Sequence, residues 1–138
     1  MEKMDFEYVV KELNARTENT LMNTLGIRYT RAGEHFLEAT MPVNETVHQP
    51  YGFLHGGASM ALAESVGSAA SHVFAQQNVL GLEFSANHLK TLRSGVVTAR
   101  AEAVHLGKRT HLWNIRITDQ DGRLISQCKL TNIVLEDR

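Results

Sequence analysis

The chain has 138 residues, of which 43% are hydrophobic and only two are proline, which predicts one domain spanning residues 1–138. Its 14 basic and 15 acidic residues almost cancel, so neither a nucleic acid nor a membrane surface is an expected partner. The amino-terminal residues lack a signal-peptide core and no apolar run reaches bilayer length, which predicts a cytoplasmic protein.

The first elements predicted along the chain are two helical segments and a β-hairpin. Phe6, Val9 and Leu13 recur at helical spacing, and the polar run before Gly26 predicts a short second turn or helix. Two alternating runs follow, GIRYT and HFLEATMPV. They are joined by RAGE, which has the glycine expected of a tight hairpin connection. We expect the two helical segments to serve packing rather than chemistry.

A long helix is predicted from residue 55 to about residue 76, after a polar loop bracketed by Pro42 and Pro50. Of the 16 residues 56–71, 12 are glycine, alanine or serine. A helix with such small side chains is slim, so other elements can approach it closely on nearly every side.

Four strands are predicted after the helix, because the hydrophobic pattern changes to period two between residues 79 and 135. In the second and third of these strands, Val97, Ala99 and Ile115 belong to rows of apolar residues that alternate with polar ones. The long helix must cover this apolar face, which predicts an α+β fold with a curved antiparallel sheet wrapped around one central helix. The only cysteine, Cys128, is predicted to be a buried, unreactive side chain in the last strand.

The start of the long helix has the features of an anion site. Backbone N–H groups there have no intrahelical partner, and they lie at the positive end of the helix dipole. Gly56 and Gly57 leave the approach open, so a carbonyl placed against the Gly56 N–H would be polarised and its oxyanion stabilised. Gln49 and His55 flank this point, and both carry donors that could hold the carbonyl or a water.

Glu64 is the candidate reactive carboxylate, because it lies among alanine, leucine, serine and valine, where a buried charge indicates a purpose. It could attack a carbonyl carbon as a nucleophile or deprotonate a water, and the sequence leaves both roles open. Ser68 follows one turn later on the same face, where it could hydrogen-bond the carboxylate or the substrate, or simply permit close packing.

The spacing of these residues predicts an assembly. Glu64 follows His55 by nine residues, which places it roughly 13 Å further along the axis and about 180° around the helix. One chain cannot easily close such a site. A two-fold partner with an antiparallel helix would bring its own Glu64 to the first helix start, giving two composite sites per dimer.

The segment HQPYGFLHGGASMALAE, the strand order and the single wrapped helix resemble the hotdog-fold acyl-CoA thioesterases of the aryl-CoA branch. That branch contains 4-hydroxybenzoyl-CoA thioesterase, dihydroxynaphthoyl-CoA hydrolase and the proofreading thioesterase of enterobactin synthesis. The resemblance extends over nearly the whole chain, through LGIRYTRAG, LEATMPV, NHLK, HLGKRTHLW and DGRL. HGG alone would be a weak motif, whereas QPxGxLHGGAxxxLAE is specific.

This resemblance implies hydrolysis of an aromatic or related acyl-CoA to the free acid and CoA, without a further cofactor. It implies a catalytic set of Gln49, His55, Gly56 and Glu64, and a homodimer with shared sites that pairs into a dimer of dimers, a homotetramer. No metal is expected, because the seven histidines show neither HExxH nor paired Cys-His spacing. The resemblance assigns the CoA contacts to Gly81, His88, Leu89, Lys90, Thr91, His105, Leu106, Gly107, Lys108, Arg109 and Thr110.

A second function is a non-catalytic module that binds or senses acyl-CoA on the same fold, since a fold does not fix a function. Glu64 distinguishes the two, because a pure binder has no need for a carboxylate near a carbonyl. The acyl group cannot be read from the sequence: Phe53, Met60 and Leu62 could line many pockets.

Overall fold

The computed structural model describes residues 3–136. Its helices are α1 (Phe6–Ala15), α2 (Leu21–Leu25) and α3 (Gly56–Ala75), with a short 3-10 helix η1 (Glu45–Val47). Its strands are β1 (Arg28–Gly33), β2 (Phe36–Val43), β3 (Val79–His88), β4 (Gly95–Leu106), β5 (Thr110–Thr118) and β6 (Leu124–Val134).

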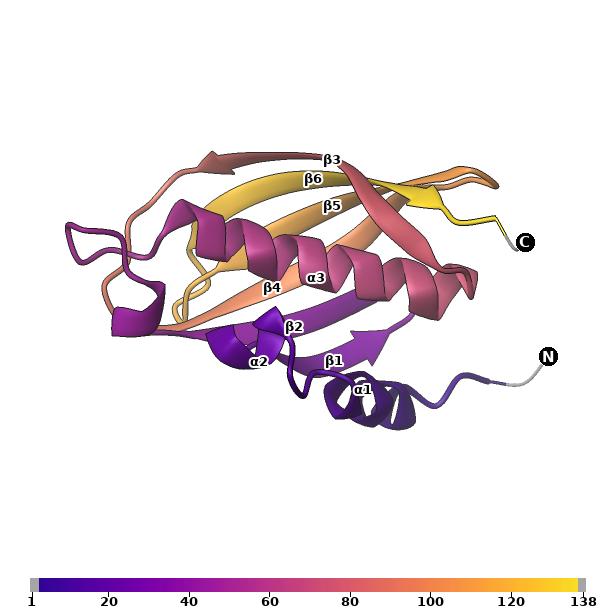
Figure 1. Ribbon diagram of the computed structural model, residues 1–138, viewed down its shortest axis with the longest axis horizontal. Helices are drawn as coiled ribbons and strands as arrows, with labels where there is room; N and C mark the ends of the chain where they lie inside the picture. Colours follow the sequence, from indigo (N-terminus) through magenta and orange to yellow (C-terminus); the bar gives the residue numbers. More distant parts are fainter. Residues whose placement is uncertain (1–2, 137–138) are drawn as a thin grey trace.

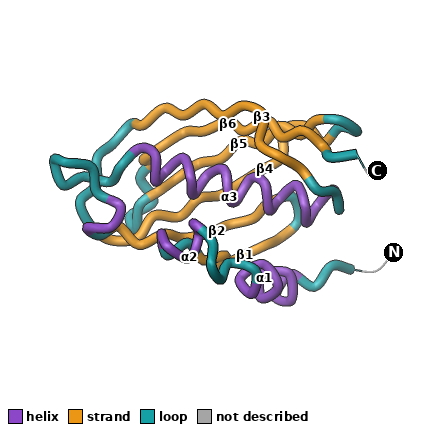
Figure 2. The backbone as a smooth tube through the Cα atoms, in the orientation of Figure 1, coloured by secondary structure: helices purple, strands orange, loops and turns teal. Residues whose placement is uncertain are grey.

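The six strands form one antiparallel sheet in the order β1-β2-β4-β5-β6-β3. The sheet curves around α3, while α1 and α2 lie near the β1 edge (Figure 1). The alternation of strands and helices along the tube is seen in Figure 2. The predicted arrangement of a curved antiparallel sheet around one long helix is therefore confirmed. Within residues 3–136, no helix is both long and apolar enough to cross a bilayer.

The turn between β1 and β2 differs from the prediction. Gly33 was expected in the turn but is the last residue of β1, and Glu34 and His35 make the connection. His35 takes the left-handed backbone conformation, with φ of 69°, which a histidine adopts more readily than most residues. Gly33 serves packing instead, because a β-carbon there would collide with the ring of Phe36.

The apolar face predicted for β4 and β5 is the face that packs on α3. Val97, Ala99 and Ile115 have no exposed surface, and the predicted core is confirmed. Helix α3 approaches the sheet closely at Gly67, where a β-carbon would lie 2.6 Å from Leu130 Cδ2. The small side chains of α3 therefore allow the sheet to pack closely around the helix, as predicted.

Leu62 and Cys128, two residues discussed in the sequence analysis, are both buried in the core. Leu62, named as a possible pocket residue, is fully buried between α3 and the sheet, so in this chain that assignment is wrong. Cys128 is buried as predicted, and burial raises the pKa of its thiol to about 11. A thiol that stays protonated is a poor nucleophile.

A buried polar network joins the carboxyl-terminal half of α3 to strands β5 and β6. Ser71 Oγ accepts hydrogen bonds from Trp113 Nε1 at 2.7 Å and from Asn132 Nδ2 at 2.9 Å. Its own hydrogen is then left for His111 Nδ1, 2.9 Å away, which places the proton of the neutral His111 ring on Nε2. His111 is fully buried, and this burial lowers its pKa below the usual range.

The folded protein is expected to lose stability as the pH falls, because of His111. Its folded pKa lies below the ordinary value of 6.5, so between the two pKa values the unfolded chain binds more protons and the free energy of unfolding rises with pH. Below the folded pKa, the contribution of neutral His111 to the free energy of unfolding is fully lost. Urea denaturation between about pH 5 and pH 7 should show a shallower slope for His111→Asn. The exposed His35→Asn is the control, and equal slopes in all three proteins would contradict the assignment.

Candidate active site

His55 shapes the start of α3 through its own ring. Its Nδ1 accepts a hydrogen bond from the Gly57 N–H at 2.8 Å, and its backbone N–H donates to Val47 O at 2.8 Å. Because Nδ1 is an acceptor, the proton of the neutral ring lies on Nε2, which is therefore a donor. His55 thus caps the helix and still offers a donor beside its first turn.

The Gly56 N–H has no hydrogen-bond partner within residues 3–136. Two later amides of the first turn are occupied, because the N–H groups of Ala58 and Ser59 both donate to His55 O, at 3.0 and 3.2 Å. Since the Gly57 N–H is also used, by the His55 ring, Gly56 supplies the open donor at the positive end of the helix dipole. A carbonyl oxygen is the ligand that fits it.

His88 explains why residue 56 must be glycine. A β-carbon on Gly56 would lie 2.7 Å from His88 Nε2, so the imidazole occupies the space beside the open amide. His88 Nδ1 is 2.8 Å from the hydroxyl of Ser126, which is fully buried. Ser126 was missed from the sequence, although its place in the same alternating row as Cys128 and Leu130 was a signal that this serine is buried.

The loop before α3 fixes the amide of Gln49. Gln49 Oε1 accepts from the backbone N–H groups of Tyr51, at 2.5 Å, and Phe53, at 3.3 Å. Both partners are donors, so the oxygen must face them and the NH₂ group must point away as a donor. The guanidinium of Arg93 covers Phe53, 4.1 Å from the ring centroid, and holds this loop in place.

Glu64 lies on the exposed surface of α3 in the single chain, and is not buried as its sequence context predicts. Its carboxylate rests against β3, where a β-carbon on Gly81 would collide with Glu64 Oε1. Gly81, expected to contact CoA, therefore makes room for the candidate reactive group. Across residues 3–136, the Glu64 side chain has neither an ion-pair partner nor a hydrogen bond to Ser68.

The predicted site residues fall into two groups at different ends of the sheet. Gly81 is in register with Asn132, then His111 and Leu106, whereas His88 is seven positions further along β3, roughly 23 Å at the rise of a strand. The helix-start group is Gln49, His55, Gly56 and residues 88–91. The carboxylate group is Glu64, Ser68, Gly81 and residues 105–110.

Each group contains part of the predicted CoA contacts. Beside the helix-start group, the backbone N–H groups of Leu89 and Lys90 both donate to Ile125 O, at 2.8 and 3.3 Å, and Thr91 is exposed. In the carboxylate group, residues 105–110 comprise the end of β4, the β4-β5 turn and the first residue of β5, and the Gly107 N–H closes the turn by donating to Thr110 O at 2.9 Å.

The β4-β5 turn carries two exposed cations. Lys108 and Arg109 have no carboxylate within ion-pair distance in the described part of the chain. A close approach of His105 requires glycine at the turn, since a β-carbon on Gly107 would lie 2.6 Å from His105 Nε2. Such unpaired donors suit phosphate groups. In residues 3–136, no three His, Cys, Asp or Glu side chains are grouped so that they could hold a metal ion.

Comparison with known proteins agrees with this chemistry. Residues 51–126 match the family model described as the thioesterase superfamily. The chain is 44% identical over 128 residues to the 1,4-dihydroxy-2-naphthoyl-CoA hydrolase of Escherichia coli, covering 91% of this chain and 94% of that protein.

The same identity over 128 residues is found with the proofreading thioesterase EntH of Cronobacter turicensis, covering 91% of this chain and 93% of the relative. Among solved structures, a mutant thioesterase from Pseudomonas aeruginosa superposes with a TM-score of 0.89 at 45% identity. That superposition covers 97% of this chain and 96% of the other.

Proposed function

Because the chain belongs to the thioesterase superfamily and is a thioester hydrolase with the hotdog fold, we propose that its substrate is an aromatic or related acyl-CoA, which it hydrolyses to the free acid and CoA. The observation that carries this proposal is the open N–H of Gly56 next to His55, with the Gln49 amide of the preceding loop oriented so that its NH₂ group is free to donate. The relative named as a 1,4-dihydroxy-2-naphthoyl-CoA hydrolase supports the aromatic acyl group. The alternative of a non-catalytic acyl-CoA binder is set aside.

In the proposed mechanism, the thioester oxygen accepts the Gly56 N–H, and this bond strengthens as the oxygen gains negative charge. Losing such a donor costs roughly 3 to 4 kcal/mol of transition-state stabilisation. Gln49 NH₂ and His55 Nε2–H hold the carbonyl or the water from either side. Glu64 attacks the carbonyl carbon and the C–S bond breaks to release CoA as its thiolate, leaving an anhydride that water then opens; alternatively, Glu64 removes a proton from the attacking water, and the tetrahedral adduct expels the CoA thiolate.

The proposed catalyst is a homodimer with shared sites, because Glu64 and Gly56 of one chain belong to separate groups of residues. An antiparallel pairing of two α3 helices would place the Glu64 of one chain at the helix start of the other. Exposed leucines on the β3 edge, Leu80 at 57% and Leu82 at 60%, support this pairing, since an unpaired apolar edge strand is a ready interface. A dimer of dimers and a cytoplasmic location stay predictions.

In the shared site, residues 105–110 would come from the chain that supplies Glu64. We place the nucleotide phosphates of CoA on Lys108 and Arg109, and the pantetheine near residues 88–91. Charge-assisted contacts made equally in the ground state and the transition state lower KM without changing kcat.

Lys108→Ala and Arg109→Ala are therefore expected to raise KM several-fold while kcat falls less. Steady-state kinetics with one aryl-CoA substrate measures both constants. Lys11→Ala, which removes a cation from the distant helix α1, is the matched control. Unchanged KM in both turn variants would move the phosphate site elsewhere.

The substrate class is tested by a steady-state screen of the purified protein against aryl, aliphatic and hydroxyacyl CoA thioesters. We expect kcat/KM to be highest for an aryl-CoA. A preference for simple aliphatic chains of every length would overturn the aromatic assignment and leave the thioester hydrolase intact.

A further inference from the structure

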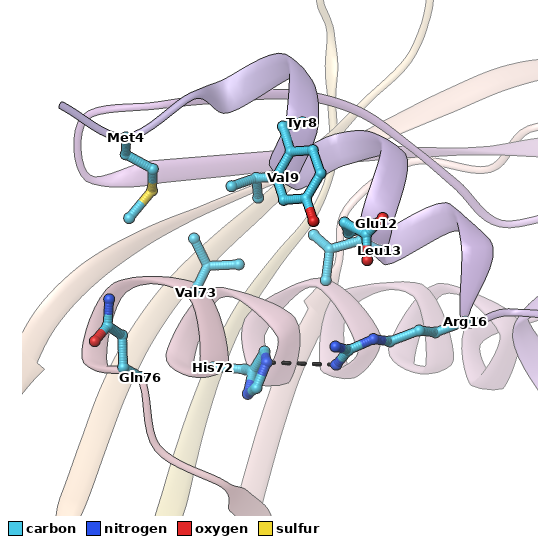
Figure 3. Close-up of a pocket in the computed structure, with 9 residues that line it drawn as sticks. All are labelled: Met4, Tyr8, Val9, Glu12, Leu13, Arg16, His72, Val73 and Gln76. Atoms are coloured by element: carbon cyan, nitrogen blue, oxygen red, sulfur yellow. Dashed lines mark hydrogen bonds between the residues drawn. The ribbon is translucent and has the colours of Figure 1, made fainter. Parts of the chain in front are cut away.

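Two hollows follow the outer side of α3 beyond Glu64. The inner hollow, about 290 Å³, lies between α3 and the α1-α2 segment, with Tyr29 of β1 in its wall. The outer hollow, about 370 Å³, continues between α1 and the end of α3 (Figure 3). The inner hollow includes Leu13, Arg16, Met22, Ser68, Ala69 and His72.

Arg16 and His72 stand where the two hollows meet, because both side chains line both of them. Arg16 Nη1 is 3.4 Å from His72 Nε2, and Figure 3 shows the guanidinium reaching from α1 toward the imidazole. Arginine only donates, so His72 Nε2 accepts. Within residues 3–136, no carboxylate lies at ion-pair distance from Arg16, and Glu12, one turn earlier in α1, is the carboxylate that shares the outer hollow with it.

Ser68, which lines the inner hollow, lies one helical turn beyond Glu64, whose carboxylate rests against β3. Glu64, Ser68 and His72 are four residues apart, so each step rises roughly 6 Å along α3 and turns about 40° around it, about 12 Å and 80° in all. This spacing belongs to a single helix, and it holds whichever chain polarises the carbonyl. An acyl group that leaves its thioester carbon at Glu64 and follows these residues along α3 passes Ser68 and ends at Arg16.

We propose that Arg16, supported by His72, is a specificity-determining residue that binds an anionic oxygen at the far end of the acyl group. This inference rests on the proposed function and narrows its substrate class to aryl acids with a distal carboxylate or phenolate. Leu13, Met22 and Ala69 supply apolar walls for a ring, and the planar guanidinium suits a bidentate carboxylate. Ser68 then lines the acyl site and need not bond Glu64.

The test compares 6-carboxy-2-naphthoyl-CoA with 2-naphthoyl-CoA, which differ only in the distal carboxylate group. In the wild type, kcat/KM is expected to be at least about tenfold higher for the carboxylated substrate, the range of a charge-assisted hydrogen bond. Arg16→Met keeps an unbranched apolar stem without the charge and should reduce that ratio about tenfold, with Arg16→Lys intermediate. Lys11→Met, which removes a charge from the same helix but lines neither hollow, should keep the wild-type ratio.

Binding of both thioesters to the Glu64→Gln protein and to its Arg16→Met double variant, measured by calorimetry, separates this inference from the proposed function. If neither thioester is hydrolysed by the wild type but the carboxylated one binds more tightly through Arg16, the aryl-CoA function fails and the inference stands. If both are hydrolysed at a ratio that Arg16→Met leaves unchanged, the inference is overturned and the function stands. Equal binding of the two thioesters to the Glu64→Gln protein also overturns it.

Discussion

Glu64→Gln is expected to lower kcat by roughly 100-fold to 10,000-fold, the range for losing a reactive acid-base group, while the Kd of the substrate stays within a few-fold of the wild type. Glutamine has nearly the same shape, so it can still pack against Gly81, and the loss reports on the carboxylate alone. Because the group acts mainly in the transition state, the effect belongs to kcat rather than to binding. Single-turnover kinetics and calorimetric titration with an aryl-CoA measure the two quantities.

Glu83→Gln is the matched control, since Glu83 is exposed on the same strand as Gly81 and loses the same charge. It should retain wild-type turnover. A Glu64→Gln protein that keeps kcat within about tenfold of the wild type would remove Glu64 from the chemistry, because an essential acid-base group contributes at least about 100-fold.

The second large effect is recovery of activity when two inactive chains are combined. Glu64→Ala lacks the carboxylate, and Gly56→Pro lacks the N–H that polarises the carbonyl. Co-refolding them should form heterodimers in which one of the two sites combines an intact Gly56 with an intact Glu64. Up to about half of the wild-type activity is expected in the heterodimer fraction, by the symmetry of a two-fold dimer.

A second, less disruptive variant is needed beside Gly56→Pro, because a β-carbon at that position would collide with His88. Gln49→Ala removes a donor of the helix-start group without filling space, so it replaces Gly56→Pro in a parallel mixture. Circular dichroism and gel filtration must show each variant to be folded and dimeric. With those controls met, mixtures that stay as inactive as their components would show that each site is built within one chain.

The sequence predicted elements best where one physical pattern dominates. Alternation in β4 and β5 identified the buried rows that include Val97 and Ile115, because a strand turns successive side chains to opposite faces. The glycines at the start of α3 and the small residues along it likewise predicted where the helix begins and how closely it is packed. The β1-β2 turn was misplaced because His35, rather than a glycine, takes the left-handed conformation there.

The sequence predicted that Glu64 lies apart from the helix start, but not which CoA contacts lie beside each of them. Gly81 and His88 are separated by seven positions of one extended strand, and the sheet register sets Gly81 beside the β4-β5 connection. Leu62 reads like a pocket residue, and only the packing of α3 against the sheet shows that it faces the core. Long-range register and helix rotation are tertiary properties that local spacing does not encode.

The buried thiol of Cys128 simplifies the measurement of the proposed reaction. Hydrolysis of an acyl-CoA releases free coenzyme A, whose thiol can be titrated continuously with a coloured disulfide reagent. Such reagents are attacked by thiolates, and the only cysteine of this chain is enclosed and has a pKa raised to about 11. The folded protein therefore adds no colour of its own, and a slow rise in absorbance without substrate would report unfolding.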